Sequence, residues 1–274
     1  MNVLLGDISS YKAIVVAKYL YKNYSDCKIY SFDSRSFTNK FRTKYSIKHF
    51  VIKEDDIDGY LEVINKNNID VFIPVINNVL DRLWCNKNHF GSTLNYLGDY
   101  DTYKVLNDKL ILHDLAEKLE IKVPKKYTTV TEAEFPFVMK PTNLSSAQGV
   151  LYVNEQHDIP TNFGFDNFII QQFVAGEGVG YSFYAKEGQI ENGYGHKRLA
   201  EYPVSGGSST YRTNYNDKRM LEVSSKIVSH LNYTGFAMFE FKLTSNNELY
   251  LLEVNPRIWG SVHQGLANNV NYFE

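Results

Sequence analysis

The first part of the chain alternates between short apolar runs and longer stretches that carry apolar residues at helical spacing. The short runs, typical of buried strands, lie at 2–7, 27–33 and 70–76. The helical spacing appears at 11–24 and 57–69. Strands that alternate with helices in this way indicate a doubly wound α/β parallel sheet.

The pattern changes near residue 100, where strands begin to follow one another with short turns. Helices are predicted at 108–127, where Pro124 would end the helix, and at 217–231. The predicted strands lie at 135–141, 149–154, 168–174, 179–190, 235–243 and 248–255. We therefore expect α/β plus α+β architecture, with one domain over 1–100 and a second over 101–274.

The loop "GDISSYKA" after the first strand is where a dinucleotide-binding fold would hold its phosphates. It does not contain G-x-G-x-x-G, so the glycines that bring the backbone close to a phosphate are missing. A packing role or a position beside a substrate is therefore favoured over a nucleotide site in this half.

Composition narrows the class of protein further. The formal net charge of −2 over 274 residues gives no electrostatic case for binding nucleic acid or membrane. Cys27 and Cys85 lack metal or redox spacing and are expected to be free, buried thiols of a reducing compartment. The first ten residues lack the basic and long apolar regions of a secretory signal, so we expect a cytoplasmic protein.

The last two predicted strands carry the clearest candidate chemistry. The turn-forming "TSNN" between them predicts a hairpin in which Glu240 and Glu253 are cross-strand neighbours. Alternation places Asn255 on the same face as Glu253. Two carboxylates and an amide oxygen form a hard oxygen site suited to Mg²⁺ beside phosphates, with Arg257 as a cation for an anion. The alternative is a pair of solvated glutamates, against which the apolar neighbours of both strands argue.

The segment "LLEVNPRIWGS" at 251–261 strongly resembles the metal-binding strand of the ATP-grasp superfamily, whose carbamoyl-phosphate synthase and biotin carboxylase branches carry E-x-N-P-R. The resemblance implies a Rossmann-like pre-ATP-grasp domain, followed by an ATP-grasp domain whose two α+β subdomains clasp ATP. It implies that Glu240, Glu253 and Asn255 hold two Mg²⁺ ions, which Mn²⁺ can replace, against the ATP phosphates. Arg257 would then meet the γ-phosphate or a carboxylate substrate.

Two lysines match the same family. Lys140 ends the apolar strand "FVMKP" and precedes "NLSSAQGV" (143–150), which resembles the family's phosphate loop. The resemblance makes Lys140 the lysine for the α- and β-phosphates, and Lys109 the lysine on the helix before the central domain. Without the resemblance, both would be read as solvated lysines.

The stretch "IIQQFVAGEG" (169–178) matches the family's adenine-binding hinge. Without the family match it reads as a buried strand and turn. The resemblance assigns to adenine the residues Gln171, Gln172, Phe173 and Val174. It assigns Glu177 to the ribose.

The segment "GHKRLAEYPVSGGSST" (195–210) resembles the biotin carboxylase-type segment whose basic residues approach the γ-phosphate and the acid substrate. His196 and Arg198 alternate with Lys197, so both can face one site. The alternative is a charged surface strand with a glycine turn.

Together these motifs predict an ATP-dependent ligase that activates a small-molecule carboxylate as an acyl phosphate, releases ADP and passes the acyl group to an amine. Arg257, Arg198 and His196 are the catalytic candidates. Two alternatives stay open: a carbamoyl-phosphate synthase-like enzyme that forms an acid phosphate, and a non-catalytic nucleotide-binding protein. A homodimer, and substrate-binding elements supplied by a missing C-terminal segment or a partner subunit, also stay open.

Overall fold

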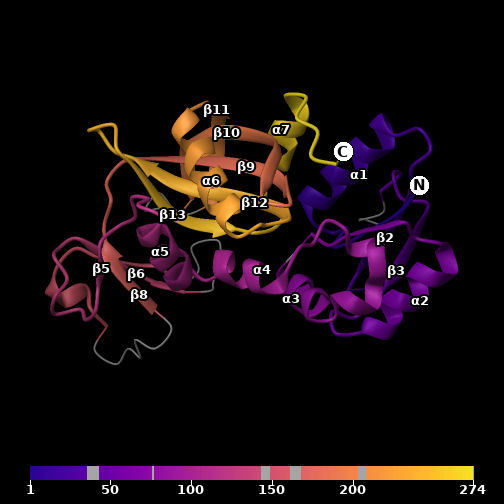
Figure 1. The fold of residues 1–274 in the computed structure, drawn as a ribbon, viewed down its shortest axis with the longest axis horizontal. Coiled ribbons are helices and arrows are strands. Elements are labelled where there is room, and N and C mark those ends of the chain that lie inside the picture. The colour runs from indigo at the N-terminus through magenta and orange to yellow at the C-terminus, as the bar shows by residue number, and fades with distance from the viewer. Residues whose placement is uncertain (36–42, 76, 143–148, 161–167, 203–207, 274) are drawn as a thin grey trace.

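The computed structural model describes residues 1–35, 43–75, 77–142, 149–160, 168–202 and 208–273. Its first sheet is parallel throughout and has the strand order β3-β2-β1-β4. These strands form the right-hand part of Figure 1. Their bounds are β1 Asn2–Leu5, β2 Lys28–Asp33, β3 Lys48–Val51 and β4 Val71–Ile73.

The crossover helices of this sheet begin at side-chain caps. Ser10 accepts a hydrogen bond from Ala13 N at the start of α1 (Tyr11–Asn23), and Asp56 accepts one from Gly59 N at the start of α2 (Ile57–Asn67). α3 (Asn77–Cys85) and a 3₁₀ segment, η2 (Lys87–Leu94), follow β4. The sequence pattern predicted neither of these, nor β3. Both cysteines are free, but Cys85 at the end of α3 is exposed and Cys27 is only half-buried, so the prediction that both are buried is wrong.

The largest sheet is antiparallel and has the order β11-β10-β9-β12-β13. A turn at Glu187 and Gly188, both at positive φ, separates β9 from β10. The single strand predicted at 179–190 is therefore wrong, because it crosses this turn. The strand bounds are β9 Glu177–Lys186, β10 Gln189–Tyr202, β11 Ser208–Asn214, β12 Gly235–Leu243 and β13 Leu249–Asn255.

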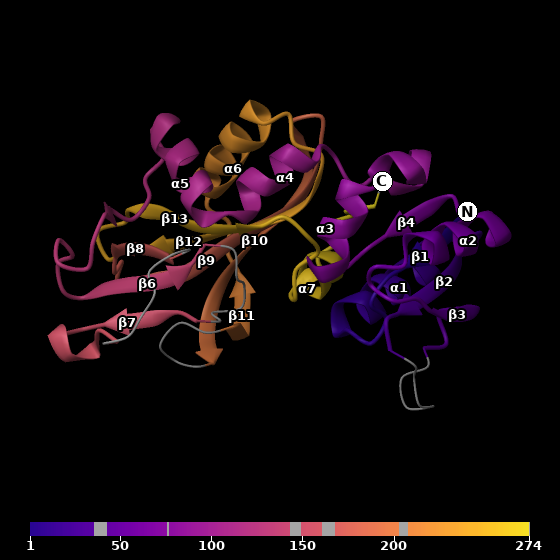
Figure 2. The same cartoon turned by 90° about the horizontal axis from the view of Figure 1, so that it is seen from below.

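A smaller antiparallel sheet has the order β5-β8-β6-β7. Figure 2 shows it on one side of the large sheet, with α4, α5 and α6 on the other side. Its elements are β5 Lys126–Tyr127, β6 Phe137–Pro141, β7 Leu151–Val153, the 3₁₀ turn η3 Gln156–Asp158 and β8 Phe168–Gln172.

One predicted helix of this part ends earlier than the apolar pattern suggested, and the helix predicted at 217–231 is found within one residue at each end. The helix predicted to run from 108 to Pro124 ends at Lys118, and Lys126–Tyr127 is a strand. The bounds are α4 Tyr100–Asn107, α5 Lys109–Lys118, α6 Lys218–His230 and α7 Val262–Ala267. Among the described residues, no helix is long and apolar enough to cross a membrane.

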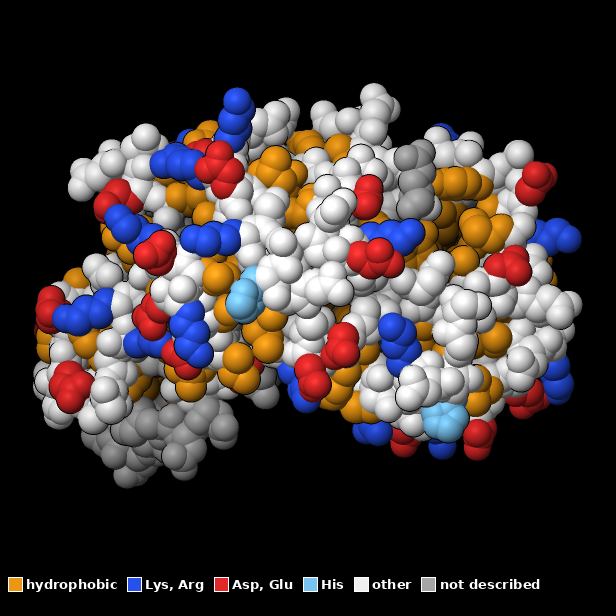
Figure 3. Space-filling model, viewed as in Figure 1, with side chains coloured by type: hydrophobic (Ala, Val, Ile, Leu, Met, Phe, Trp, Pro, Cys, Tyr) orange, Lys and Arg blue, Asp and Glu red, His pale blue; other side chains and the backbone are white. Residues whose placement is uncertain are grey.

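One hydrophobic cluster joins the two halves of the chain. It contains Val3 and Val16 from the parallel sheet and its helix, together with Tyr184, Phe236 and Trp259 from the large sheet and the segment after it. A separate cluster packs α5 and α6 against the large sheet, and a third fills the small sheet. Figure 3 shows charged side chains of both signs interspersed over one face.

Candidate active site

A row of residues crosses the large sheet at the centre of the candidate site. Glu240 on β12 pairs with Glu253 on β13, as the hairpin predicted. On its other side Glu240 pairs with Gly180 of β9, and Gly180 pairs with His196 of β10. The sheet thus aligns two carboxylates, a glycine and an imidazole across four strands.

A β-bulge in β13 orients Glu253. The register shifts there, so that Glu240 pairs with Glu253 while Phe241 pairs with Leu251 and leaves Leu252 as the extra residue. The bulge lets Leu251 stay in the core with the neighbouring helices while Glu253 faces the opposite side. The backbone carbonyl of the extra residue, Leu252, accepts hydrogen bonds from His113 Nε2 at 3.0 Å and from Lys140 Nζ at 3.3 Å.

Two buried lysines surround Glu253. Lys109 Nζ lies 3.3 Å from Glu253 Oε2, and Lys140 is 6% exposed. Burial lowers the pKa of Lys140 to about 8, although Glu253 opposes the shift. Burial alone would raise the pKa of Glu253, but Lys109 and Lys140 outweigh it and hold that pKa below its ordinary value. Both lysines, expected from the motifs, are therefore beside the same carboxylate.

Glu240 is held by an arginine and an amide. Arg198 Nη2 forms an ion pair with Glu240 Oε2, and Asn255 Nδ2 donates to Glu240 Oε1 at 3.2 Å. Arg257 Nη2 donates to Asn255 Oδ1 at 3.0 Å. Burial raises the pKa of Glu240 even beside Arg198, while the same ion pair raises the pKa of Arg198. Arg198 also contacts Glu201 Oε1 at 3.2 Å.

Two glycines on β9 make room for the basic side chains of β10. A Cβ at Gly180 would lie 2.5 Å from His196 Cε1, and one at Gly178 would lie 2.8 Å from Arg198 Cδ. His196 is buried, and its Nδ1 has no hydrogen-bond partner within the described part of the chain. Burial, with Arg198 and Arg212 nearby, lowers the pKa of His196 to about 3, so the imidazole is neutral at pH 7.

The carboxylate and amide oxygens at this site are of the chemical type that binds a hard divalent cation. Glu240, Glu253 and Asn255 carry side-chain oxygens on adjacent strands, and oxygen is the ligand type that Mg²⁺ prefers. Among the described residues, no group of three or more His, Cys, Asp or Glu side chains lies in metal-binding geometry. Lys109, Lys140, Arg198 and Arg257 outnumber the two carboxylates. That surplus of cations suits a phosphate chain carrying its own metal.

The predicted adenine hinge comprises the end of β8 and the residues that follow it. Gln171 is 3% exposed, and its Oε1 has no hydrogen-bond partner among the described residues. Val174 is buried, whereas Phe173 is 37% exposed and lies edge-on to Tyr152 at 6.0 Å between ring centroids. Gln172 N donates to Lys125 O at 2.8 Å, which closes β8 against the start of β5.

The remaining predicted residues lie near this site or outside the described chain. Glu177, expected at the ribose, is largely exposed and pairs with Lys197 at 2.7 Å. The predicted phosphate loop falls mostly on 143–148, outside the described residues, and 203–207 of the second basic segment do too. The structure thus brings both lysines, both arginines, both glutamates, His196 and Asn255 together.

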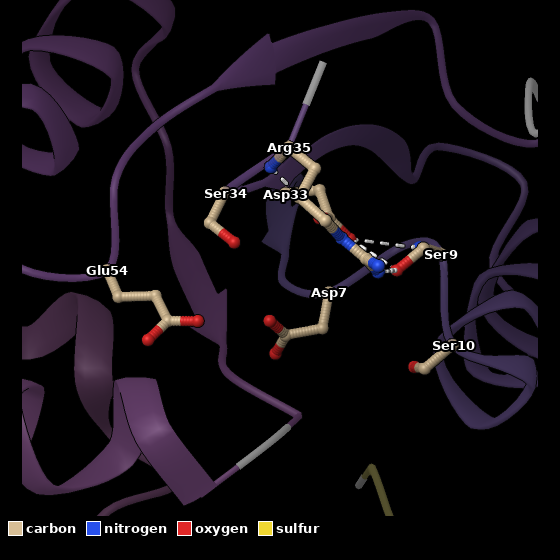
Figure 4. A pocket seen from close by; sticks show the side chains of 7 residues that line it. All are labelled: Asp7, Ser9, Ser10, Asp33, Ser34, Arg35 and Glu54. Carbon is tan, nitrogen blue, oxygen red and sulfur yellow. Dashed lines mark hydrogen bonds and ion pairs between the residues drawn. The ribbon is translucent and has the colours of Figure 1, made fainter. Parts of the chain in front are cut away.

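A polar pocket of about 440 Å³ lies beside the ends of β1 and β2 (Figure 4). Arg35 Nη2 donates to Ser9 Oγ at 2.8 Å, and Ser9 Oγ donates to Asp33 Oδ2 at 2.6 Å. The loop "GDISSYKA" therefore borders this pocket. Its lining residues are Asp7, Ser9, Ser10, Asp33, Ser34, Arg35 and Glu54.

Sequence reasoning missed the residues that support the site from other elements. His113 on α5 looked like an ordinary polar position, and Glu201 on β10 was noted only as part of the segment that resembles biotin carboxylase. The glycines at 178 and 180 carried the one available signal, since two glycines on the same face of a strand indicate close approach by a neighbour. Lys12 on α1 gave no signal, because a lysine in the first turn of a helix reads as solvated.

At this site the small sheet meets the large one, because Lys140 Nζ on β6 donates to Leu252 O on β13. The family model of the ATP-grasp domain matches residues 106–261, which is more than half of the chain. The chain therefore belongs to the ATP-grasp family. None of the curated proteins matches it.

Solved structures of similar fold have low sequence identity. N5-carboxyaminoimidazole ribonucleotide synthetase from Staphylococcus aureus, complexed with ADP, is 16% identical with a TM-score of 0.75, covering 97% of this chain and 73% of that one. Biotin carboxylase from Campylobacter jejuni is 13% identical with a TM-score of 0.75, covering 94% and 65%. L-amino acid ligase from Bacillus licheniformis is 14% identical with a TM-score of 0.67, covering 98% and 68%. At these identities the likeness shows the fold.

Proposed function

We propose that this protein is an ATP-dependent ligase that joins a small-molecule carboxylate to an amine through an acyl phosphate. The observation that carries the proposal is the Glu240–Glu253 pair, with Asn255 beside it and four cationic side chains around it. Family membership, and the ligases and ADP complex among the structures of similar fold, support the same activity.

We propose that the nucleotide lies between the small sheet and the large sheet. Adenine lies against the hinge at Gln171–Val174, Glu177 faces the ribose, and Lys109 and Lys140 contact the α- and β-phosphates. Glu240, Glu253 and Asn255 would hold Mg²⁺, which neutralises charge on the phosphate oxygens when bound. The proposed organisation is a Rossmann-like pre-ATP-grasp domain over 1–100 and an ATP-grasp domain over 101–274.

The proposed reaction has two steps. A carboxylate oxygen attacks the γ-phosphorus, the bond between that phosphorus and the bridging oxygen breaks, and ADP leaves with the electron pair. The amine nitrogen then attacks the acyl carbon, the carbon–oxygen bond to phosphate breaks, and the nitrogen loses a proton. Arg257 and Arg198 stabilise the charge on the transferring phosphoryl group. His196, neutral at pH 7, serves as a hydrogen-bonding partner rather than as a cation.

The test is to incubate the protein with ATP and Mg²⁺, screen amino acids and small carboxylates with and without amines, and identify the products. The expected products are ADP, phosphate and an amide. ADP formation with an acid alone and no amide would favour an enzyme that forms an acid phosphate. AMP and pyrophosphate would overturn the acyl-phosphate route, and the absence of ATP binding would indicate a non-catalytic protein.

A further inference from the structure

Lys12, in the first turn of α1, connects two segments that are distant in sequence. Its Nζ donates to Val75 O at 2.7 Å, just after β4, and to Ile258 O at 3.0 Å, just after β13. Val75 N in turn donates to Asp7 Oδ2 at 3.2 Å. One ammonium group thus fixes the segment after β13 to the edge of the parallel sheet.

Arg257 shares one of these acceptors. Arg257 Nη1 donates to Ile258 O at 3.3 Å, and its Nη2 donates to Asn255 Oδ1 at 3.0 Å. Both ends of the guanidinium are therefore held by this segment's own groups. Because Lys12 binds the same Ile258 carbonyl, the orientation of that carbonyl depends on Lys12.

The position is an unfavourable one for a lysine. Burial, followed by repulsion from Arg257, lowers the pKa of Lys12 to about 7, which Asp7 only partly offsets. A cation in the first turn of a helix also opposes the helix dipole. An uncharged side chain would avoid these costs, so a role in stability alone does not explain this residue.

We infer that Lys12 is a positioning residue, which places the Arg257 guanidinium at the γ-phosphate by holding Ile258 O against the parallel sheet. The inference rests on the proposed function, because it requires a nucleotide at the Glu240–Glu253 site. It assigns to α1 a part in phosphate recognition that acts through the segment after β13.

The experiment compares the affinities for ADP and for β,γ-imido-ATP with Mg²⁺ by calorimetry, because their ratio isolates contacts to the γ-phosphate. The variants are Lys12→Met, Arg257→Gln, the double variant and Lys12→Arg. Lys18→Met is the control, since Lys18 is exposed on the same helix. Thermal unfolding of each variant reports stability separately.

Arg257→Gln should reduce the affinity ratio about tenfold, the loss expected for a charge-assisted contact. Lys12→Met should reduce it about three- to tenfold. The double variant should match Arg257→Gln, Lys12→Arg should restore most of the ratio, and Lys18→Met should leave it unchanged.

A wild-type ratio in Lys12→Met would overturn the inference, whatever its stability. So would losses that multiply in the double variant, because they would show that Lys12 acts independently of Arg257. An unchanged ratio in Arg257→Gln would overturn it as well. Failure of the wild-type protein to bind either nucleotide would instead refute the proposed function.

Discussion

The Glu240–Glu253 pair shows how single charges determine what the site can bind. Like charges directly opposite each other across two strands are destabilising unless cations compensate them. Here Lys109 compensates Glu253, and Arg198 compensates Glu240. The two glutamates still differ, because the pKa of Glu253 lies below its ordinary value and the pKa of Glu240 lies above it. Glu253 is therefore the more firmly ionised of the two.

We expect Glu253→Gln to keep the fold but reduce Mg²⁺-dependent ATP turnover at least a hundredfold, a loss of about 3 kcal/mol. Glutamine preserves the volume of the side chain and removes the charge that is proposed to hold the ion. The measurement is steady-state ADP formation across titrations of Mg²⁺ and Mn²⁺, with circular dichroism to check folding. Glu248→Gln, just before the same strand, is the control, since Glu248 pairs with Lys122 at the surface. Near wild-type rates at low Mg²⁺ in a folded Glu253→Gln protein would refute the metal assignment.

At the scale of elements, the sequence predicted most accurately those strands whose bounds depend on the local pattern of apolar residues and turns. The predicted strand 235–243 is β12 to the residue, because its apolar alternation ends at a turn. β11 and β3 were missed because "SSTYRTN" and "KHFV" lie at sheet edges and carry no apolar alternation. The bulge at Leu252 was not predictable, since two adjacent leucines do not show which one faces the core.

The contributions of distant elements to the site were also beyond sequence reasoning. The pairing of Glu240 with Glu253 follows from one hairpin, so local sequence was sufficient. The contact of Arg198 with Glu240 needs the tertiary order of β10, β9 and β12. The same holds for Lys12, whose partners Val75 and Ile258 are set by the packing of two sheets.

Gly180→Ala tests the arrangement of β9 and β10. The added Cβ would lie 2.5 Å from His196 Cε1, so the buried ring has to move, at a cost of about 1–3 kcal/mol in stability. Chemical denaturation measures this cost. Gly260→Ala is the control, because a Cβ there meets nothing within 4 Å. Adding His196→Ala to Gly180→Ala should recover most of the loss, and a failure to recover it would contradict the close approach of these two residues.

His113 on α5 predicts a pH dependence of stability. Burial, followed by repulsion from Lys140, lowers its pKa from 6.5 to about 4 in the folded protein. The unfolded chain therefore binds more protons between these values, so this group's contribution to the free energy of unfolding is lost as the pH falls from 6.5 towards 4.

The measurement for His113 is denaturant unfolding at several pH values, for the wild type and His113→Gln. The difference between their free energies of unfolding should shrink by up to about 1.4 kcal/mol per pH unit as the pH falls through this window. It should be constant between pH 7 and 8. A difference that does not change between pH 6.5 and 4 would show that His113 is not kept neutral by burial.

At the scale of the whole molecule, the shared hydrophobic cluster determines how the two halves behave together. Tyr96 stacks on Phe236 at 5.2 Å between ring centroids, and Phe236 contacts Phe273 at 5.4 Å. Trp259 and Val3 belong to the same cluster. Because apolar side chains from both halves share one core, separating the halves would expose it to water. The contacts of Lys12 with Val75 O and Ile258 O lie across the same boundary, so the proposed positioning of Arg257 requires the two halves to stay together.

We therefore expect Phe236→Ala to destabilise the parallel sheet as well as the large sheet, although Phe236 lies on β12. Removing a buried phenylalanine costs about 3–5 kcal/mol, and a shared core passes that loss to every element that opens with it. Native-state hydrogen exchange should show the same loss of protection in β1 and β2 as in β9. Phe137→Ala is the matched control, since Phe137 lies in the separate cluster of the small sheet and should affect mainly β6 and β8. Unchanged protection of β1 and β2 in Phe236→Ala would show that the halves open independently, and a boundary that opens in this way could not hold Arg257 through Lys12.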